Sequence, residues 1–146
     1  MSRAFIKEDA GDDEVPERRP PSGPNYVTPR GLELLVEKAR LLKDRRAELS
    51  KEERRDLRYW QARRDSAVPV DNSKRPPDDV RFGALVSLRT GAGTRRVRIV
   101  GQDEAEEGGE KVSWDSIPAR VLTGHKVGER VELETGEAEL TAIAYP

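Results

Sequence analysis

The chain has 146 residues, of which 34% are hydrophobic, 5% aromatic and 38% charged, and its 27 basic and 28 acidic residues leave a formal net charge of −1. This amount of apolar material fills one modest core but not a deep ligand cavity as well, which argues against a metabolic enzyme. A net charge near zero argues against a protein that coats nucleic acid, and the absence of cysteine excludes disulfides, thiolate nucleophiles and cysteine-ligated zinc.

The sequence has no apolar run of about 18 residues, the length needed to cross a bilayer. Its first residues also lack the apolar core of a secretory signal. We therefore expect a cytoplasmic protein that makes no membrane contact.

Residues 1–25 alternate acidic clusters with a run rich in Pro, Arg and Gly, and they show no apolar periodicity. Such a composition cannot bury enough apolar surface to offset the loss of chain entropy on folding. We expect a disordered tail, which lends solubility or makes a weak contact.

Residues 26–68 are predicted to form a helical hairpin, and the first helix has a clear start. Thr28 is a good N-cap and Pro29 a good first helical residue, because its missing N–H would have no partner there. Leu34 and Leu41 widen the apolar stripe of this helix; they either pair two hairpins or pack on Trp60, and we expect a monomer. The residues that form the stripe, a seam for a partner helix, are Leu32, Leu35, Ala39, Leu42 and Leu49.

The second helix is predicted from a capping box, in which Ser50 and Glu53 satisfy each other's free backbone N–H groups. It therefore begins near Lys51. The short connection implies that the two helices run antiparallel, as a short coiled coil. The residues expected to face inward are Leu57, Trp60 and either Ala67 or Val68. The arginines expected to face mostly outward are Arg54, Arg55, Arg58, Arg63 and Arg64.

After a predicted linker at 69–80, the pattern changes from helical to strand-like, so residues 81–146 are expected to form a separate domain. The runs 84–88 and 95–100 flank a glycine-containing turn and predict a β-hairpin. Residues 111–115 indicate a third strand.

A short helix is predicted from Ser116 to Thr123, ending at Gly124. Residues 131–134 and 138–144 predict a closing hairpin, whose second strand has alternating small and apolar residues at Ala138, Leu140, Ala142 and Ala144. The expected fold class is α+β: a helical hairpin followed by a small antiparallel sheet with one covering helix.

No set of residues provides a nucleophile, a base and a group that orients the base. His125 is the only histidine and lies in a turn flanked by glycines, so we interpret it as a solvent-exposed turn residue. Gly91 and Gly93 join two strands and do not lead into a helix, which argues against a phosphate-binding loop. We expect no catalytic residue, no metal ligand and no cofactor in this chain.

Acidic residues gather near the predicted hairpin tip, where paired carboxylates could hold a divalent cation. Arginines and lysines interleave with them at spacings that favour i,i+3 and i,i+4 ion pairs. A solvated, ion-paired face is therefore favoured over a cation site. The acidic residues concerned are Asp44, Glu48, Glu52, Glu53 and Asp56.

Three stretches of the chain are similar to sequence motifs of a known protein family. Residues 26–35 (Tyr-Val-Thr-Pro-Arg-Gly-Leu-Glu-Leu-Leu) are similar to the start of a coiled-coil hairpin, and residues 81–86 (Arg-Phe-Gly-Ala-Leu-Val) to the first strand of a C-terminal domain. Residues 98–105 and 115–128 are similar to the pattern I-V-G-x-D-E followed by S-P-x-A-R-A-L-x-x-K-x-V-G. Together these stretches, which extend over nearly everything after residue 25, resemble the bacterial GreA/GreB transcript-cleavage factors.

The resemblance implies an FKBP-like C-terminal domain that grips RNA polymerase at the rim of its secondary channel, with the hairpin pointing into the channel toward the catalytic magnesium. The protein would then contact nucleic acid only indirectly, through the transcription complex. In this sequence Ile117 stands where the family has a proline after serine, and Pro118 takes the next place. A short helix that only caps the sheet is the alternative interpretation. By position, the resemblance assigns the grip to Asp115, Ser116, Ile117, Pro118, Ala119 and Arg120.

Cleaving members of the family have a longer hairpin, whose tip carries an acidic motif of the form G-D-x-x-E-N-A-E/D-Y that helps hold a second magnesium ion. Residues 49–53 have no such motif, and the arm is shorter by several turns. We therefore predict a factor that docks without stimulating cleavage, similar to the short-hairpin relatives known as regulators of nucleoside diphosphate kinase.

Three rival functions stay open. The first is a cleavage-competent factor that uses Glu48, Glu52 or Glu53 in place of the missing acids. The second is a prolyl isomerase, for which Phe82, Trp114 and Tyr145 are the available aromatic residues. The third is a nucleic-acid-binding protein that uses the arginines of the hairpin, with binding that depends steeply on salt.

Overall fold

The computed structural model describes residues 15–146 and divides the chain into two compact units. The helical unit contains residues 15–22 and 35–66, and the β unit contains residues 23–34 and 67–146. The predicted division into a tail, a hairpin, a linker and a C-terminal domain at 25/26, 68/69 and 80/81 stays a prediction, and its first 14 residues lie outside the described residues.

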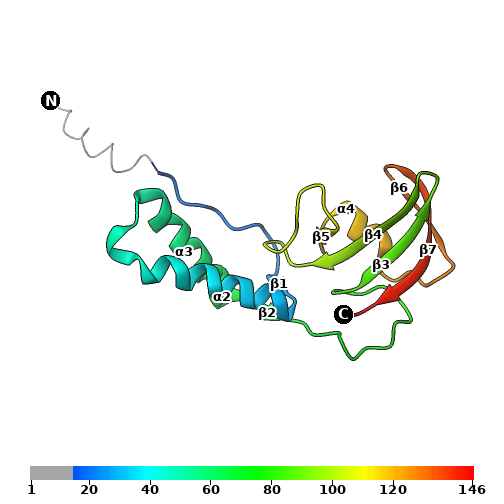
Figure 1. Ribbon diagram of the computed structural model, residues 1–146, viewed down its shortest axis with the longest axis horizontal. Coiled ribbons are helices and arrows are strands. Elements are labelled where there is room, and N and C mark those ends of the chain that lie inside the picture. Colours follow the sequence, from blue (N-terminus) through cyan, green and yellow to red (C-terminus); the bar gives the residue numbers. More distant parts are fainter. Residues whose placement is uncertain (1–14) are drawn as a thin grey trace. The chain divides into compact units, whose positions relative to one another are not determined.

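The two long helices are α2, Pro29–Asp44, and α3, Lys51–Ser66, joined through the short 3-10 helix η1, Arg46–Glu48 (Figure 1). Both helix starts lie where the sequence predicts them. Thr28 Oγ1 accepts a hydrogen bond from the Gly31 N–H at 2.9 Å. At α3, Ser50 Oγ accepts from the Glu53 N–H at 3.1 Å, and the Glu53 carboxyl group accepts from the Ser50 N–H at 3.0 Å.

The buried face of α3 differs from the predicted one. Leu57 is buried as expected, but Tyr59 and Arg63 are buried with it, and Trp60 is only half-buried. Arg63, which we expected to face outward, is 3% exposed. Tyr59 and Arg63 are one helical turn apart and so share a face, and a long arginine stem buries apolar surface that the sequence pattern counts as polar.

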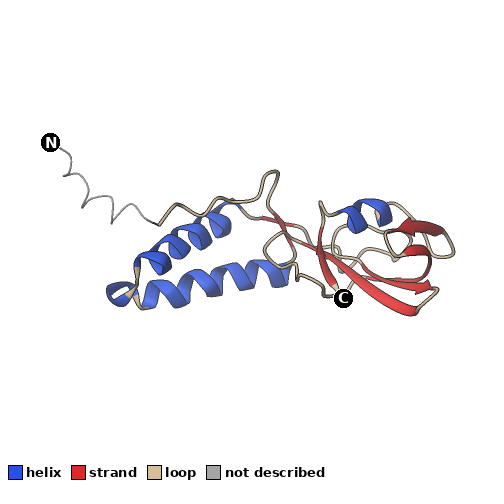
Figure 2. Ribbon diagram, turned by 90° about the horizontal axis from the view of Figure 1, so that it is seen from above, coloured by secondary structure: helices blue, strands red, loops and turns tan. Residues whose placement is uncertain are grey.

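The β unit contains a five-stranded sheet with the strand order β5-β4-β3-β7-β6, shown in red in Figure 2. Its strands are β3 (Leu85–Thr90), β4 (Gly93–Val100), β5 (Lys111–Ser113), β6 (Arg130–Leu133) and β7 (Gly136–Ala144). Both predicted hairpins are present, β3–β4 and β6–β7, and β3 also pairs antiparallel with β7.

The predicted antiparallel sheet is confirmed except at one edge, where one pair of strands is parallel. Strand β5 pairs parallel with β4, with Arg98 opposite Lys111 and Ile99 opposite Val112. The loop between these strands returns the chain to the start of the paired stretch, and the Arg98 N–H donates to the Glu110 carbonyl oxygen at 2.8 Å. A parallel pair needs such a crossover connection, so the sheet is mixed.

A β-bulge changes which residues of β7 face the core. Ser87 pairs with Ala142 but Leu88 pairs with Leu140, so Thr141 is an extra residue in β7. Ala138 and Leu140 are buried as predicted. Beyond the bulge the alternation shifts by one residue, so Ile143 is buried, whereas Ala142 and Ala144 are exposed, contrary to the prediction.

The core of the β unit lies between the sheet and helix α4, Ile117–Leu122 (Figure 2). Val80, at the end of the predicted linker, is fully buried in this core, so the linker does not remain apart from the domain. The Val80 N–H donates to the His125 carbonyl oxygen at 2.9 Å, and the Gly124 N–H donates to the Val80 carbonyl oxygen at 2.8 Å. These bonds attach residue 80 to the end of α4.

A second, two-stranded parallel sheet pairs β1 (Tyr26–Val27) with β2 (Val68–Pro69). Gly101 lies directly against this sheet, because a Cβ placed on it would collide with the Tyr26 carbonyl oxygen. No other residue fits this close approach of two backbones. Among residues 15–146, no helix is long and apolar enough to cross a membrane.

Candidate functional site: the exposed first turn of helix α4

Helix α4 is bounded by local signals at both ends. Ser116 is the N-cap, and its Oγ accepts a hydrogen bond from the Ala119 N–H at 3.4 Å. Pro118 lies in the first turn, where its missing N–H would have no helical partner. At the other end, Gly124 has a φ of +92° and follows the C-cap residue Thr123.

The replacement of Ser-Pro by Ser-Ile-Pro moves the proline from the first to the second helical position. Both positions belong to the first turn, whose N–H groups lack carbonyl partners within the helix. The helix therefore accepts Pro118 without losing a backbone hydrogen bond. The departure from the family pattern instead changes which side chain occupies the first position, and that side chain is Ile117.

The six residues predicted as a polymerase grip divide between the core and the surface. Ala119 is fully buried against the sheet, and Ser116 and Pro118 are half-buried. Ile117 is 70% exposed, the largest exposed fraction among the large apolar residues described as exposed. Asp115 and Arg120 are exposed on either side of it in sequence. The segment thus presents an apolar side chain between an acid and a base.

Hydrogen bonds hold the Asp115 carboxyl group in place. It accepts from the Ser113 hydroxyl and from the Gln102 side-chain amide, the latter at 3.0 Å. The hydrogen bond from Ser113 is the largest cause that lowers the pKa of Asp115 below its ordinary value. The bond from Gln102 and the positive charge of Arg120 lower it further. Asp115 is therefore a fixed negative charge at neutral pH.

An aromatic cluster lies beside α4 and includes Tyr26, whose place in it the sequence does not predict. The Tyr26 ring lies edge-on to the Trp114 ring at 5.1 Å between centroids and 6.2 Å from the Phe82 ring. These three rings, with Arg120 and Thr123, border a hollow of about 380 Å³. Tyr145, the third aromatic residue proposed for an isomerase pocket, instead lines a different hollow.

The Tyr26 ring packs on Trp114 and forms part of the wall of the aromatic hollow. Tyr26 precedes the N-cap of α2 by two residues, so the sequence suggested only a lead-in to a helix. An aromatic residue followed by Val27 was the available signal. No local pattern, however, indicated a partner 88 positions away.

The acidic residues predicted at the hairpin tip are distributed among arginine partners. Asp44 pairs with Arg40 at 3.0 Å, and Glu53 pairs with Arg45 at 3.1 Å. The Ser50 N–H, followed by Arg45, lowers the pKa of Glu53. Glu48 and Glu52 are exposed. Within residues 15–146, no group of three or more His, Asp or Glu side chains is placed to hold a metal ion.

Comparison with protein families identifies residues 75–144 as a match to the family described as "Transcription elongation factor, GreA/GreB, C-term". This stretch contains the whole five-stranded sheet and helix α4. The matched region therefore includes the candidate site.

Similar proteins carry the same description. The chain is 38% identical over 97 residues to transcription elongation factor GreB of Neisseria meningitidis, which covers 62% of this chain and 60% of that protein. It is 36% identical over 85 residues to transcription elongation factor GreA of Pelobacter propionicus, with 54% of each covered. A solved GreA/GreB structure from Nitrosomonas europaea is 20% identical with a TM-score of 0.44, covering 83% of this chain and 99% of that one.

The chain spans only about 54–60% of the length of these curated relatives. The family match at residues 75–144 coincides with the five-stranded sheet and α4. Residues 75–144 are therefore similar to the C-terminal domain described for the GreA/GreB transcription elongation factors.

Proposed function

We propose that this protein is a transcription factor that binds RNA polymerase through the first turn of α4, at the entrance of the secondary channel. The observation that carries the proposal is the 70% exposure of Ile117 between two charged residues. Covering a large exposed apolar side chain with a partner removes apolar surface from water, and this favours binding. Its flanking charges can orient that partner.

The local rigidity of the turn supports a docking role. The Ser116 cap and the buried Ala119 attach the helix to the sheet, and two hydrogen bonds fix Asp115. A preorganised surface loses little conformational entropy when it binds. The segment can therefore act as a rigid contact even though its proline is displaced by one position.

We further propose that the protein docks without stimulating transcript cleavage. Asp44 and Glu53 are already paired with arginines, and Glu53 also caps α3. Their arginine partners would compete with a second magnesium ion for these carboxylates. The factor would then occupy the channel entrance and modulate elongation or displace longer-armed relatives, and its short hairpin makes it similar to the regulators of nucleoside diphosphate kinase. We also propose that the β unit has an FKBP-like fold and that the protein is a monomer.

Binding to purified bacterial core RNA polymerase tests the docking proposal. We expect the wild-type chain to bind at micromolar concentration and Ile117→Asp to weaken binding by about tenfold or more, the range of an interface hot spot. Val127→Asp is the matched control, because Val127 is 51% exposed and lies outside the predicted segment. Absence of wild-type binding at micromolar concentration would remove the proposal, and equal binding of the two variants would remove the assigned surface.

A stalled transcription complex tests the second part separately. We expect no short 3′ RNA fragments above the level released without the factor. Fragment release that Glu48→Gln or Glu52→Gln abolishes would support the cleavage-competent rival instead, while leaving the docking proposal intact.

A further inference from the structure

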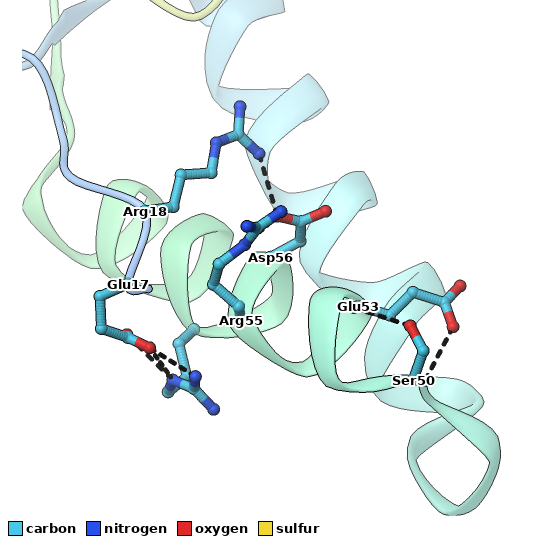
Figure 3. Close-up of polar contacts among 7 residues, drawn as sticks. Glu17, Arg18, Ser50, Glu53, Arg55 and Asp56 are labelled. Atoms are coloured by element: carbon cyan, nitrogen blue, oxygen red, sulfur yellow. Dashed lines mark hydrogen bonds and ion pairs between the residues drawn. The ribbon is translucent and has the colours of Figure 1, made fainter. Parts of the chain in front are cut away.

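A strap formed by residues 15–22 lies along helix α3 in the helical unit (Figure 3). The strap contains no helix or strand, in agreement with its composition, but its side chains make specific contacts that the predicted disordered tail does not anticipate. Glu17 and Arg18 reach from the strap to residues of α3 (Figure 3).

Arg18 of the strap lies on two aromatic rings of α3. Its guanidinium carbon is 4.0 Å from the centroid of the Tyr59 ring and 4.8 Å from that of the Trp60 ring. The two rings meet edge to face at 4.8 Å and so form one corner-shaped surface. Both distances are within the range of a cation–π interaction. The same guanidinium is 3.5 Å from the Asp56 carboxyl group.

Glu17, the preceding residue, binds Arg58 in a fork-like geometry. Arg58 Nε donates to both Glu17 carboxyl oxygens, at 3.0 and 3.2 Å, and Arg58 Nη2 donates to Oε1 as well. This pairing lowers the pKa of Glu17, and Arg55 contributes a smaller attraction. The acid and the base of the strap thus each meet an opposite charge on α3, Glu17 at Arg58 and Arg18 at Asp56.

The strap is also suited to an extended, displaceable binding mode. It contains Pro16, Pro20 and Pro21, which favour a polyproline II conformation and reduce the entropy lost on docking. Glu17, Arg18 and Arg58 are each at least 40% exposed, and exposed ion pairs are weak and screened by salt. A short tether compensates for weak contacts by keeping the strap at a high local concentration.

We propose that Asp56, Arg58, Tyr59 and Trp60 form a recognition site for an extended, proline-rich segment in which an acid directly precedes an arginine. The strap occupies this site within its own chain and so keeps out a proline-rich segment of a partner protein that has the same order of charges. Aromatic surfaces that bind proline-rich segments are a known mode of peptide recognition, and here Asp56 adds a charge opposite to that of the arginine.

A labelled peptide with the sequence of residues 15–22 tests the proposal on the full chain. In Arg18→Ala the chain's own strap is weakened, so we expect the peptide to bind this variant at least about fivefold more tightly than wild type. Arg19→Ala is the matched control, because it removes the same charge from an exposed neighbour for which the described residues show none of the Arg18 contacts. A peptide with alanine at the Arg18 position should bind the Arg18→Ala chain at least about fivefold more weakly than the native peptide.

The indole N–H resonance of Trp60 supplies an independent readout. It should shift in Arg18→Ala but not in Arg19→Ala, and the native peptide should return it toward the wild-type position. Equal peptide binding by the two variants, or an unshifted resonance in both, would overturn the proposal. Tighter binding of Arg18→Ala to a random oligonucleotide, without peptide binding, would also overturn it and would indicate a nucleic-acid surface.

Discussion

Thr28 links the start of α2 to the loop after β4, and replacing it with valine removes this link without changing the size of the side chain. Thr28 Oγ1 accepts from the Gly31 N–H at 2.9 Å and donates to Glu104 Oε1 at 2.6 Å. Thr28 is 2% exposed, and the Glu104 side chain is 4% exposed. Both groups are too deeply buried for water to replace the lost partner easily.

The expected cost follows from these two hydrogen bonds. Loss of an N-cap costs about 1 kcal/mol. A buried polar group left without its donor costs about 1–3 kcal/mol, and Lys111 Nζ, at 3.9 Å, is a distant second partner for Glu104. We therefore expect Thr28→Val to lower the free energy of unfolding of the β unit by about 2–4 kcal/mol.

Urea denaturation followed by tryptophan fluorescence measures this change. Thr28→Ser keeps the hydroxyl group and should cost less than about 1 kcal/mol, since it removes only a methyl group. If Thr28→Val cost no more than Thr28→Ser, the hydroxyl group would not hold the two segments together, and the reasoning from the Glu104 contact would be refuted.

Two further predictions concern the β unit. Gly101→Ala should lower the free energy of unfolding by about 1–3 kcal/mol in urea, because the new Cβ collides with the Tyr26 backbone; Gly91→Ala, where a Cβ meets no atom, should be close to neutral, and equal effects would contradict the close approach. The lowered pKa of Asp115 adds stability that is present above the unfolded-state pKa of about 4 and is lost as pH falls through the lower folded-state pKa. Urea titrations should therefore show a stability gap between wild type and Asp115→Asn at pH 6 that closes as pH falls toward 2, and a gap independent of pH would refute the assignment.

The features that the sequence predicted are those held by hydrogen bonds within a few residues. Thr28 and Gly31 define the start of α2, Ser50 and Glu53 define the start of α3, and Ser116 with Gly124 brackets α4. Each signal combines a side-chain cap or a left-handed glycine with neighbours at most four positions away, so a single sequence suffices to detect it.

The features that the sequence could not predict depend on distant partners. The shift at Thr141 arises from pairing with β3, more than 50 positions earlier, and the parallel entry of β5 depends on the path of the intervening loop. The contact of Tyr26 with Trp114 and that of Glu17 with Arg58 likewise join segments that no periodicity connects. At α4, the motif predicts a binding segment, and that stays a prediction; only the structure separates the exposed Ile117 from the buried Ala119.

The central claim, that the first turn of α4 contacts RNA polymerase, is tested most directly by site-specific photocrosslinking. A photoreactive phenylalanine derivative placed at position 117 should crosslink to a polymerase subunit, whereas the same group at position 127 should not. A chain that binds polymerase but crosslinks from position 127 and not from position 117 would contradict the claim.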